Sequence, residues 1–310
     1  MPRTLIAFLI TLTMLAAPAS AQERVTLGSG RLFTNDTLGD GQDRWRTGSY
    51  VASWMRGPDG TVSLPGGFGE LIEYRFASQI FAPANLLTPA PGDRRYGGAM
   101  SLGAYSHFTH AGYDFALGAE LVAVGPMTGL DGFHAAAHTA LGMTAPSAAV
   151  RAAQFGNRVY PAAGVEVSRP IGLGFGGDAS GLVLRPFIQG RAGDETYARA
   201  GADLLFGPNF TSGVLVRDES TGILYQTFDD APGKGLSFLL GADTAKVFSS
   251  AWLPASGGYT LTPTRSRARA GIHWQGETLG AFYGATWLSP EFTAQPEGQV
   301  LGSVQLRLRF

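Results

Sequence analysis

The stretch "GSVQLRLRF" (302–310) ends the chain, and its alternation decides the fold class. In an extended strand, side chains of alternating residues point to opposite faces. One face here carries Val304, Leu306, Leu308 and Phe310, and the other carries Gln305, Arg307 and Arg309. An edge strand of a soluble sheet would show the same pattern. A terminal aromatic residue on such a strand, however, resembles the signal that the barrel assembly machinery recognises in bacterial outer-membrane barrels.

The same period of two recurs along the chain. In "RSRARAGIHW" (265–274), three arginines share one face, whereas Ala268, Ala270, Ile272 and Trp274 share the other. A soluble sandwich would bury the apolar face, whereas a membrane barrel turns it to lipid and turns the charged face to the lumen. Twelve segments are candidate strands: 25–36, 44–56, 68–82, 95–108, 111–125, 157–168, 181–192, 195–206, 236–249, 262–275, 278–288 and 299–310. The sequence therefore predicts an all-β, transmembrane antiparallel β-barrel of about twelve strands, with both chain ends in the periplasm.

The predicted lumen is charged. It would hold Glu73, Arg75, Glu166, Arg185, Arg191, Arg199, Asp203, Arg265, Arg267, Arg269, Arg307 and Arg309. Both signs occur on long side chains, which favours a lumen filled by ion pairs over an open pore. The connection at about 207–235 should be a periplasmic turn, although it is long for one.

The N-terminus has the features of a secretory signal. Arg3 precedes a short apolar run, and "ASA" (19–21) supplies the small residues of a cleavage site before Gln22. We therefore expect a signal peptide over 1–21 and a barrel domain over 22–310. The chain has no cysteine, a net charge of −1 and no later run of 18 apolar residues, so disulfides, nucleic-acid binding and a membrane-spanning helix are not expected. The predicted location is the bacterial outer membrane.

This topology brings four polar segments to the outer rim. They are Asn35 and Asp36, then Asp43, Arg44 and Thr47, then the loop 83–95, and then the segment "GPMTGLDGFHAAAHTALG" (125–142). The last segment predicts one short helix in an extracellular loop, capped by Asp131 and ended by Gly142.

Two histidines lie one helical turn apart on this predicted helix, so His134 and His138 share one side of it. Three interpretations are open from the residues alone. The pair could bind zinc, although no third ligand is evident in the sequence. Both could be surface histidines of a loop helix, or a single histidine could act as a base beside the acidic, amide-bearing rim.

Four motifs in order resemble the outer-membrane lipid A 3′-O-deacylases, a family of twelve-stranded barrels. They are "ND…DRWRTG" (35–48), "GDRRYGGAMSLG" (92–103), "VGPMTGLDGFHAAAH" (124–138) and "EFTAQ…GSVQLRLRF" (291–310). The resemblance covers most of the chain after the signal peptide. It implies calcium-assisted hydrolysis of an ester on the lipid A disaccharide of lipopolysaccharide.

The resemblance also assigns roles to individual residues. The catalytic histidine of the family falls on His138, and His134 stands where the family usually has glutamine. Asn35 and Thr47 would orient the ester or donate to the developing oxyanion, and Asp36 would be a ligand of Ca²⁺, which prefers oxygen. The chain departs from some relatives at Thr144, where they carry an acidic residue, at Pro146, where a tyrosine is expected, and at Leu86 and Leu87, where they carry a basic pair.

Arg94 and Arg95 could replace that basic pair in binding lipid A phosphate, because guanidinium pairs with phosphate in a forked geometry. The alternative for Arg94 is that it only anchors its loop. The alternative function is a non-catalytic barrel, either a transport channel or a structural surface protein. The mixed charges of the predicted lumen argue against a channel. A phospholipase barrel with a Ser–His pair is a weaker alternative, because no serine stands out near the helix.

Overall fold

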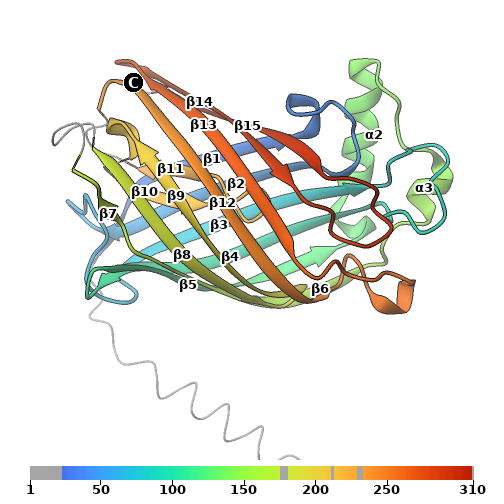
Figure 1. Ribbon diagram of the computed structural model, residues 1–310, viewed down its shortest axis with the longest axis horizontal. Coiled ribbons are helices and arrows are strands. Elements are labelled where there is room, and N and C mark those ends of the chain that lie inside the picture. The colour runs from blue at the N-terminus through green and yellow to red at the C-terminus, as the bar shows by residue number, and fades with distance from the viewer. Residues whose placement is uncertain (1–22, 175–180, 211–212, 229–232, 309–310) are drawn as a thin grey trace, which may run out of the picture.

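The computed structural model describes residues 23–174, 181–210, 213–228 and 233–308. The predicted signal peptide and Phe310 lie outside these ranges. Twelve antiparallel strands close into a barrel, because β1 pairs with β15 and β6 pairs with β8 (Figure 1). The strands of the wall are β1 (Arg24–Asn35), β2 (Trp45–Pro58), β3 (Leu71–Ala82), β4 (Gly97–His110), β5 (Tyr113–Val124), β6 (Arg158–Ser168), β8 (Leu182–Ala192), β9 (Glu195–Phe206), β12 (Gly235–Ser250), β13 (Arg265–Gln275), β14 (Leu279–Leu288) and β15 (Gln299–Leu308). A short strand β7 (Ile171–Gly172) pairs with β8.

The predicted fold class is confirmed, and all twelve predicted strands are present. Where the structure describes the end of a strand, the observed end differs from the predicted one by at most three residues. The third strand, for example, is predicted to begin at 68 and begins at Leu71. The period of two is therefore a reliable signal here. Each strand has one face towards the lumen and one towards the outside, and a shift by one residue would exchange them.

The outward and inward faces differ as predicted. On β13, Ile272 and Trp274 are 41% and 46% exposed, whereas Arg265, Arg267 and Arg269 are buried. Inside, Arg269 lies 2.5 Å from Asp203, Arg267 lies 3.0 Å from Asp243, and Arg75 lies 2.7 Å from Glu73. Burying a charge is costly unless it is paired, so these contacts account for charges inside the barrel. The prediction of an ion-paired lumen is confirmed.

The connection between β9 and β12 is not a simple turn. It forms a hairpin of β10 (Val214–Arg217) and β11 (Leu224–Phe228), which lies inside the barrel at the end opposite the rim helices (Figure 1). We call it the luminal hairpin. Its side chains pack against inward residues of five or more wall strands, in the cluster Leu32, Val51, Met55, Leu71, Leu205, Val214, Val216, Ile223, Leu224, Tyr225, Phe228, Leu239 and Phe282.

Polar contacts also fix the luminal hairpin to the wall. The hydroxyls of Tyr225 and Ser53 are 2.7 Å apart, and Arg217 donates to Glu166 at 2.9 Å. Gly28 of β1 allows close approach, because a Cβ there would lie 2.4 Å from the Cβ of Phe228. The length of the 207–235 connection is thus explained by a hairpin that packs inside this half of the barrel.

The opposite end of the barrel carries the rim loops. The β1–β2 loop contains the 3₁₀ helix η1 (Asp36–Leu38), and the β5–β6 connection contains η2 (Pro126–Thr128), α2 (Leu130–Leu141) and α3 (Ala148–Ala152). The short 3₁₀ helices η3 (Pro208–Phe210) and η4 (Ala255–Gly257) lie in other connections. In Figure 1, α2 and α3 stand beside the β1–β2 loop at one end of the barrel. Among the described residues, no helix is both long and apolar enough to cross a membrane.

Candidate active site

The end of β1 and the β1–β2 loop build one half of the site. Asn35 caps η1, because its Oδ1 accepts a hydrogen bond from the backbone N–H of Thr37 at 2.8 Å. The next residue, Asp36, is fully buried. Its carboxylate accepts from the backbone N–H of Arg44 at 2.7 Å and from the hydroxyl of Thr47 at 3.2 Å. The loop therefore folds back on itself around the Asp36 carboxylate.

A second carboxylate, that of Asp43, lies beside the first. Asp43 has a φ of 52°, a left-handed conformation that is uncommon outside glycine. Its carboxylate also accepts from the hydroxyl of Thr47. A threonine hydroxyl has one hydrogen, so the two carboxylates compete for it. Burial, followed by the charge of Asp43, raises the pKa of Asp36 to about 7. Burial opposes ionisation of Asp43 too, but hydrogen bonds from His134 and Thr47 lower the pKa of that carboxyl.

The helix α2 builds the other half of the site. Gly142 ends it as predicted, in a left-handed conformation, with its N–H bonded to Thr139 O. The predicted N-terminal cap is corrected, because Gly129 occupies that position and Asp131 lies in the first turn, where it accepts from Arg151 of α3 at 2.7 Å. That ion pair holds α2 and α3 together at the rim.

The two histidines of α2 face the barrel and are buried, so they are not surface residues. Their ring centroids are 4.1 Å apart. The Nδ1 of His138 donates to the carbonyl oxygen of Thr144 at 2.6 Å, and the Nδ1 of His134 lies 2.9 Å from the hydroxyl of Tyr96. Each ring therefore has Nδ1 occupied and Nε2 directed to the interior of the site.

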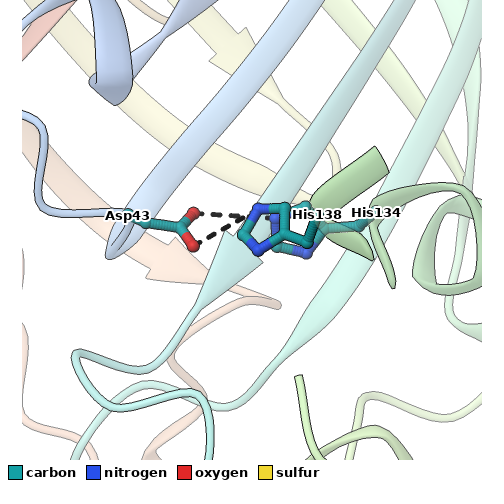
Figure 2. Close-up of side chains that lie close together, drawn as sticks. All are labelled: Asp43, His134 and His138. Atoms are coloured by element: carbon teal, nitrogen blue, oxygen red, sulfur yellow. Dashed lines mark ion pairs between the residues drawn. The ribbon is translucent and has the colours of Figure 1, made fainter. Parts of the chain in front are cut away.

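The Nε2 atoms of both histidines face the carboxylate of Asp43. They lie 3.6 Å (His134) and 3.3 Å (His138) from its carboxylate oxygens, and one ligand atom from each of the three residues lies within 4.8 Å of the others. Figure 2 shows the two imidazoles side by side, facing the Asp43 carboxylate across the space between α2 and the β1–β2 loop. The catalytic histidine that the resemblance implied is thus adjacent to the loop that carries Asn35, Asp36 and Thr47.

The two arginines of the loop before β4 have different surroundings. Arg94 is 1% exposed, pairs with Glu291 and packs 4.6 Å above the ring of Phe81. This geometry favours the alternative in which Arg94 anchors the loop. Arg95 is exposed at the rim and remains the candidate for a phosphate contact.

Sequence reasoning missed two residues of the site. The sequence predicts that Asp43 lies at the rim but indicates no function for it. Tyr96 lies in the motif at 92–103, which likewise indicates no function for this side chain. Asp43 lies among loop residues of a kind that commonly form turns, so its type alone carried no signal. Only its contacts with Thr47, His134 and His138 distinguish it.

Three side chains of the site offer oxygen ligands around one point, the carboxylates of Asp36 and Asp43 and the hydroxyl of Thr47. A hard divalent cation such as Ca²⁺ prefers such ligands. A cation would also reduce the repulsion between these two neighbouring carboxylates, which compete for one hydroxyl hydrogen. The donor set therefore fits the ion that the resemblance implies.

Comparisons with known proteins agree with the resemblance. The family model described as "Outer membrane protein LpxR" matches residues 5–310. The solved structure of LpxR from Salmonella typhimurium superposes with a TM-score of 0.72 at 17% sequence identity, covering 91% of this chain and 100% of that one. The β domain of the Bordetella autotransporter BrkA gives a TM-score of 0.41 at 10% identity, covering 91% of this chain and 99% of that one. No match was found among the curated proteins.

Proposed function

This chain belongs to the LpxR family of outer membrane proteins, and from that premise we propose that it is a lipid A deacylase that hydrolyses an ester-linked acyl chain. The proposal rests on the contact between His138 and Asp43, which lies beside Asp36 and Thr47 at the barrel rim. A histidine held by a carboxylate and a carbonyl is a suitable general base for activating water. The substrate assignment rests on family membership.

His138 would take the proton from the attacking water. Its Nδ1–H is bonded to Thr144 O, so the neutral ring has its lone pair on Nε2, the atom that faces the site. Asp43, at 3.3 Å, would stabilise the imidazolium that forms. The imidazolium would then return the proton to the leaving alcohol as the tetrahedral intermediate collapses.

Asn35 and Thr47 would act differently from each other. The Oδ1 of Asn35 already accepts from Thr37, so its amide N–H is the group left to donate to the developing oxyanion. The hydroxyl of Thr47 contacts Asp36 and Asp43, which makes Thr47 a positioning residue for the two carboxylates. Ca²⁺, when bound by the oxygens of Asp36, Asp43 and Thr47, would supply polarisation of the ester carbonyl.

The surroundings of the site suit a lipid substrate. On and beside α2, the apolar side chains of Met127, Phe133 and Leu141 are 49%, 66% and 73% exposed. Arg95 is exposed on the neighbouring loop and could pair with a lipid A phosphate. We propose that this rim faces the outside of the cell, where the lipid A leaflet lies. The luminal hairpin packs inside the opposite half of the barrel, and this position argues against the alternative of a transport channel.

The test uses bacteria that have no lipid A deacylase of their own. The mass profile of their lipid A is compared between cells that express this protein and cells that do not. Expression of the native chain should produce a lipid A species lighter by one ester-linked acyl chain. Expression of His138→Ala to the same level should leave the profile unchanged. A native chain that reaches the outer membrane and produces no lighter species would refute the proposed function.

A further inference from the structure

We propose that His134, His138 and Asp43 form a binding site for a divalent transition metal such as Zn²⁺, distinct from the oxygen-ligand site for Ca²⁺. We further infer that an ion bound there inhibits the protein, because it occupies the Nε2 of His138. The first statement is independent of the proposed function. The second rests on it.

The distances between the candidate ligand atoms suit a small tetrahedral ion. With metal–ligand bonds of about 2.0–2.1 Å, tetrahedral geometry separates neighbouring ligand atoms by about 3.3–3.4 Å. The Nε2 atoms of His138 and His134 lie 3.3 Å and 3.6 Å from oxygens of Asp43. One ligand atom from each of the three side chains lies within 4.8 Å of the others, so the side chains would move closer together to enclose one ion.

The other nitrogen of each ring is already held. Histidines that bind metals almost always donate their second N–H to an oxygen, which fixes the tautomer and the ring orientation. His138 donates from Nδ1 to Thr144 O at 2.6 Å, and the Nδ1 of His134 lies 2.9 Å from the hydroxyl of Tyr96. His138 therefore has the arrangement that a metal site requires before any ion binds, and His134 has a hydroxyl in position to accept its Nδ1–H.

The charge distribution points to a cation between these groups. In the tautomer in which Nδ1 of His134 donates to Tyr96, as Nδ1 of His138 donates to Thr144 O, two nitrogen lone pairs and a carboxylate converge in a buried space. Lone pairs that face each other repel unless a proton or a metal ion lies between them. Thr47 also donates to Oδ1 of Asp43, the oxygen that faces His134, so the carboxylate cannot turn away without losing that hydrogen bond.

The two sites offer different types of ligand atom, so each prefers a different ion. Imidazole nitrogen suits Zn²⁺, Co²⁺ and similar ions, whereas Ca²⁺ takes oxygen ligands. Asp43 is the one side chain that both sites would use, together with Asp36 and Thr47 for Ca²⁺ and with the two histidines for Zn²⁺. Three protein ligands leave a fourth position of a tetrahedral ion for water.

The binding test uses the full-length mature protein in detergent, stripped with a chelator and titrated with Co²⁺ as a spectroscopic probe for Zn²⁺. We expect visible absorption bands of tetrahedral Co²⁺ at one ion per chain, and Zn²⁺ should remove them. His134→Gln and Asp43→Asn should each weaken Co²⁺ binding by tenfold or more. Tyr96→Phe removes only the outer hydrogen bond and should weaken it by about 10- to 100-fold.

The matched control is His110→Gln, because His110 is an exposed histidine at the end of β4, at the other end of the barrel. It should bind Co²⁺ as the native chain does. Heat-modifiable mobility of each variant on a gel reports whether its barrel has folded. Absence of tetrahedral Co²⁺ bands in the folded native protein would overturn the site, as would a folded His134→Gln variant that gives native bands and affinity.

The inhibition test measures lipid A deacylation in Ca²⁺ buffer with increasing Zn²⁺. The native chain should lose activity over the range of Zn²⁺ that displaces Co²⁺, and His134→Gln should require at least tenfold more Zn²⁺ for the same fractional loss. Zn²⁺ that displaces Co²⁺ without lowering activity would overturn the inhibition. A native chain that binds Co²⁺ but shows no deacylation before Zn²⁺ is added would refute the proposed function and leave the metal site in place.

Discussion

The carboxylate of Asp43 lies 3.3 Å from the Nε2 of His138, although β2, β3, β4 and β5 separate the two residues in the sequence. This contact joins the loop after β1 to the helix after β5. The antiparallel alternation of the strands puts both connections at the same end, and the curvature of the closed barrel brings them together (Figure 1). The catalytic proposal and the metal proposal both depend on this pair.

Replacement of His138 by alanine should abolish deacylation. A general base contributes roughly 10²- to 10⁴-fold to a rate, so the loss should be visible in the lipid A mass profile of whole cells. Because α2 lies outside the barrel wall, the variant should keep native heat-modifiable mobility. His134→Ala should lower the rate less than His138→Ala, and His110→Ala should match the native chain. A fully active His138→Ala variant would show that this histidine is not the base.

Removal of Ca²⁺ with a strong chelator should stop the activity of the purified protein, and added Ca²⁺ should restore it. The reason is the oxygen donor set of Asp36, Asp43 and Thr47, which meets the preference of a hard cation. Asp36→Asn keeps the size of the side chain and removes its charge, so it should need more Ca²⁺ for half-maximal activity. Activity that persists in chelator would exclude Ca²⁺ from the reaction.

Substitution of the two rim arginines should separate substrate binding from stability. Arg95→Ala should raise KM for phosphorylated lipid A by about tenfold, which corresponds to the loss of about 1.4 kcal/mol from one charged contact. Arg94→Ala should instead destabilise the fold, because it removes the pairing with Glu291 and the packing on Phe81, while Arg46 and Arg265 still pair with Glu291. Kinetics on lipid A with and without phosphate, and the temperature at which gel mobility shifts, measure the two effects. Equal effects of both substitutions on KM would contradict the assignment.

Cysteine labelling on intact cells tests which end of the barrel faces outside. The native chain has no cysteine, so a single introduced thiol is the only target. Phe133→Cys lies on α2 and is 66% exposed, and Val62→Cys lies at the other end and is 57% exposed. A membrane-impermeant maleimide should label the first and not the second, and disruption of the cells should expose both. Labelling of Val62→Cys alone would mean that the rim site faces the periplasm.

The luminal hairpin should keep the barrel closed to ions. We expect the native protein to show no steady conductance in planar lipid bilayers. Replacement of 209–233 by a short Gly–Ser linker removes β10 and β11 and should produce a measurable conductance, at the cost of a lower unfolding temperature. Folding of the deletion variant is checked by gel mobility. Equal conductance of the native and deleted proteins would show that the hairpin does not seal the lumen.

Much of the architecture could be predicted from local sequence. Each wall strand has an apolar face towards lipid and a charged or small face towards the lumen, and this alternation repeats with period two. The helix α2 was also predicted, because its alanines and the following Gly142 are local signals. The luminal hairpin was not predicted. Its residues are buried by the surrounding wall on several sides, so their burial depends on strands from distant parts of the chain.

The barrel, the order of its strands and the resemblance to the family were all predictable from the sequence alone, and His138 as the catalytic histidine is an expectation from that resemblance. The sequence did not supply a third ligand for the histidine pair, and it left the roles of Arg94 and Arg95 equal. The tertiary structure decided both questions. It placed Asp43 against both imidazoles and turned Arg94 inward to Glu291. The physical reason is that a metal or catalytic site depends on distances between side chains on different loops, and barrel closure sets those distances, whereas periodicity along one strand depends only on its own backbone.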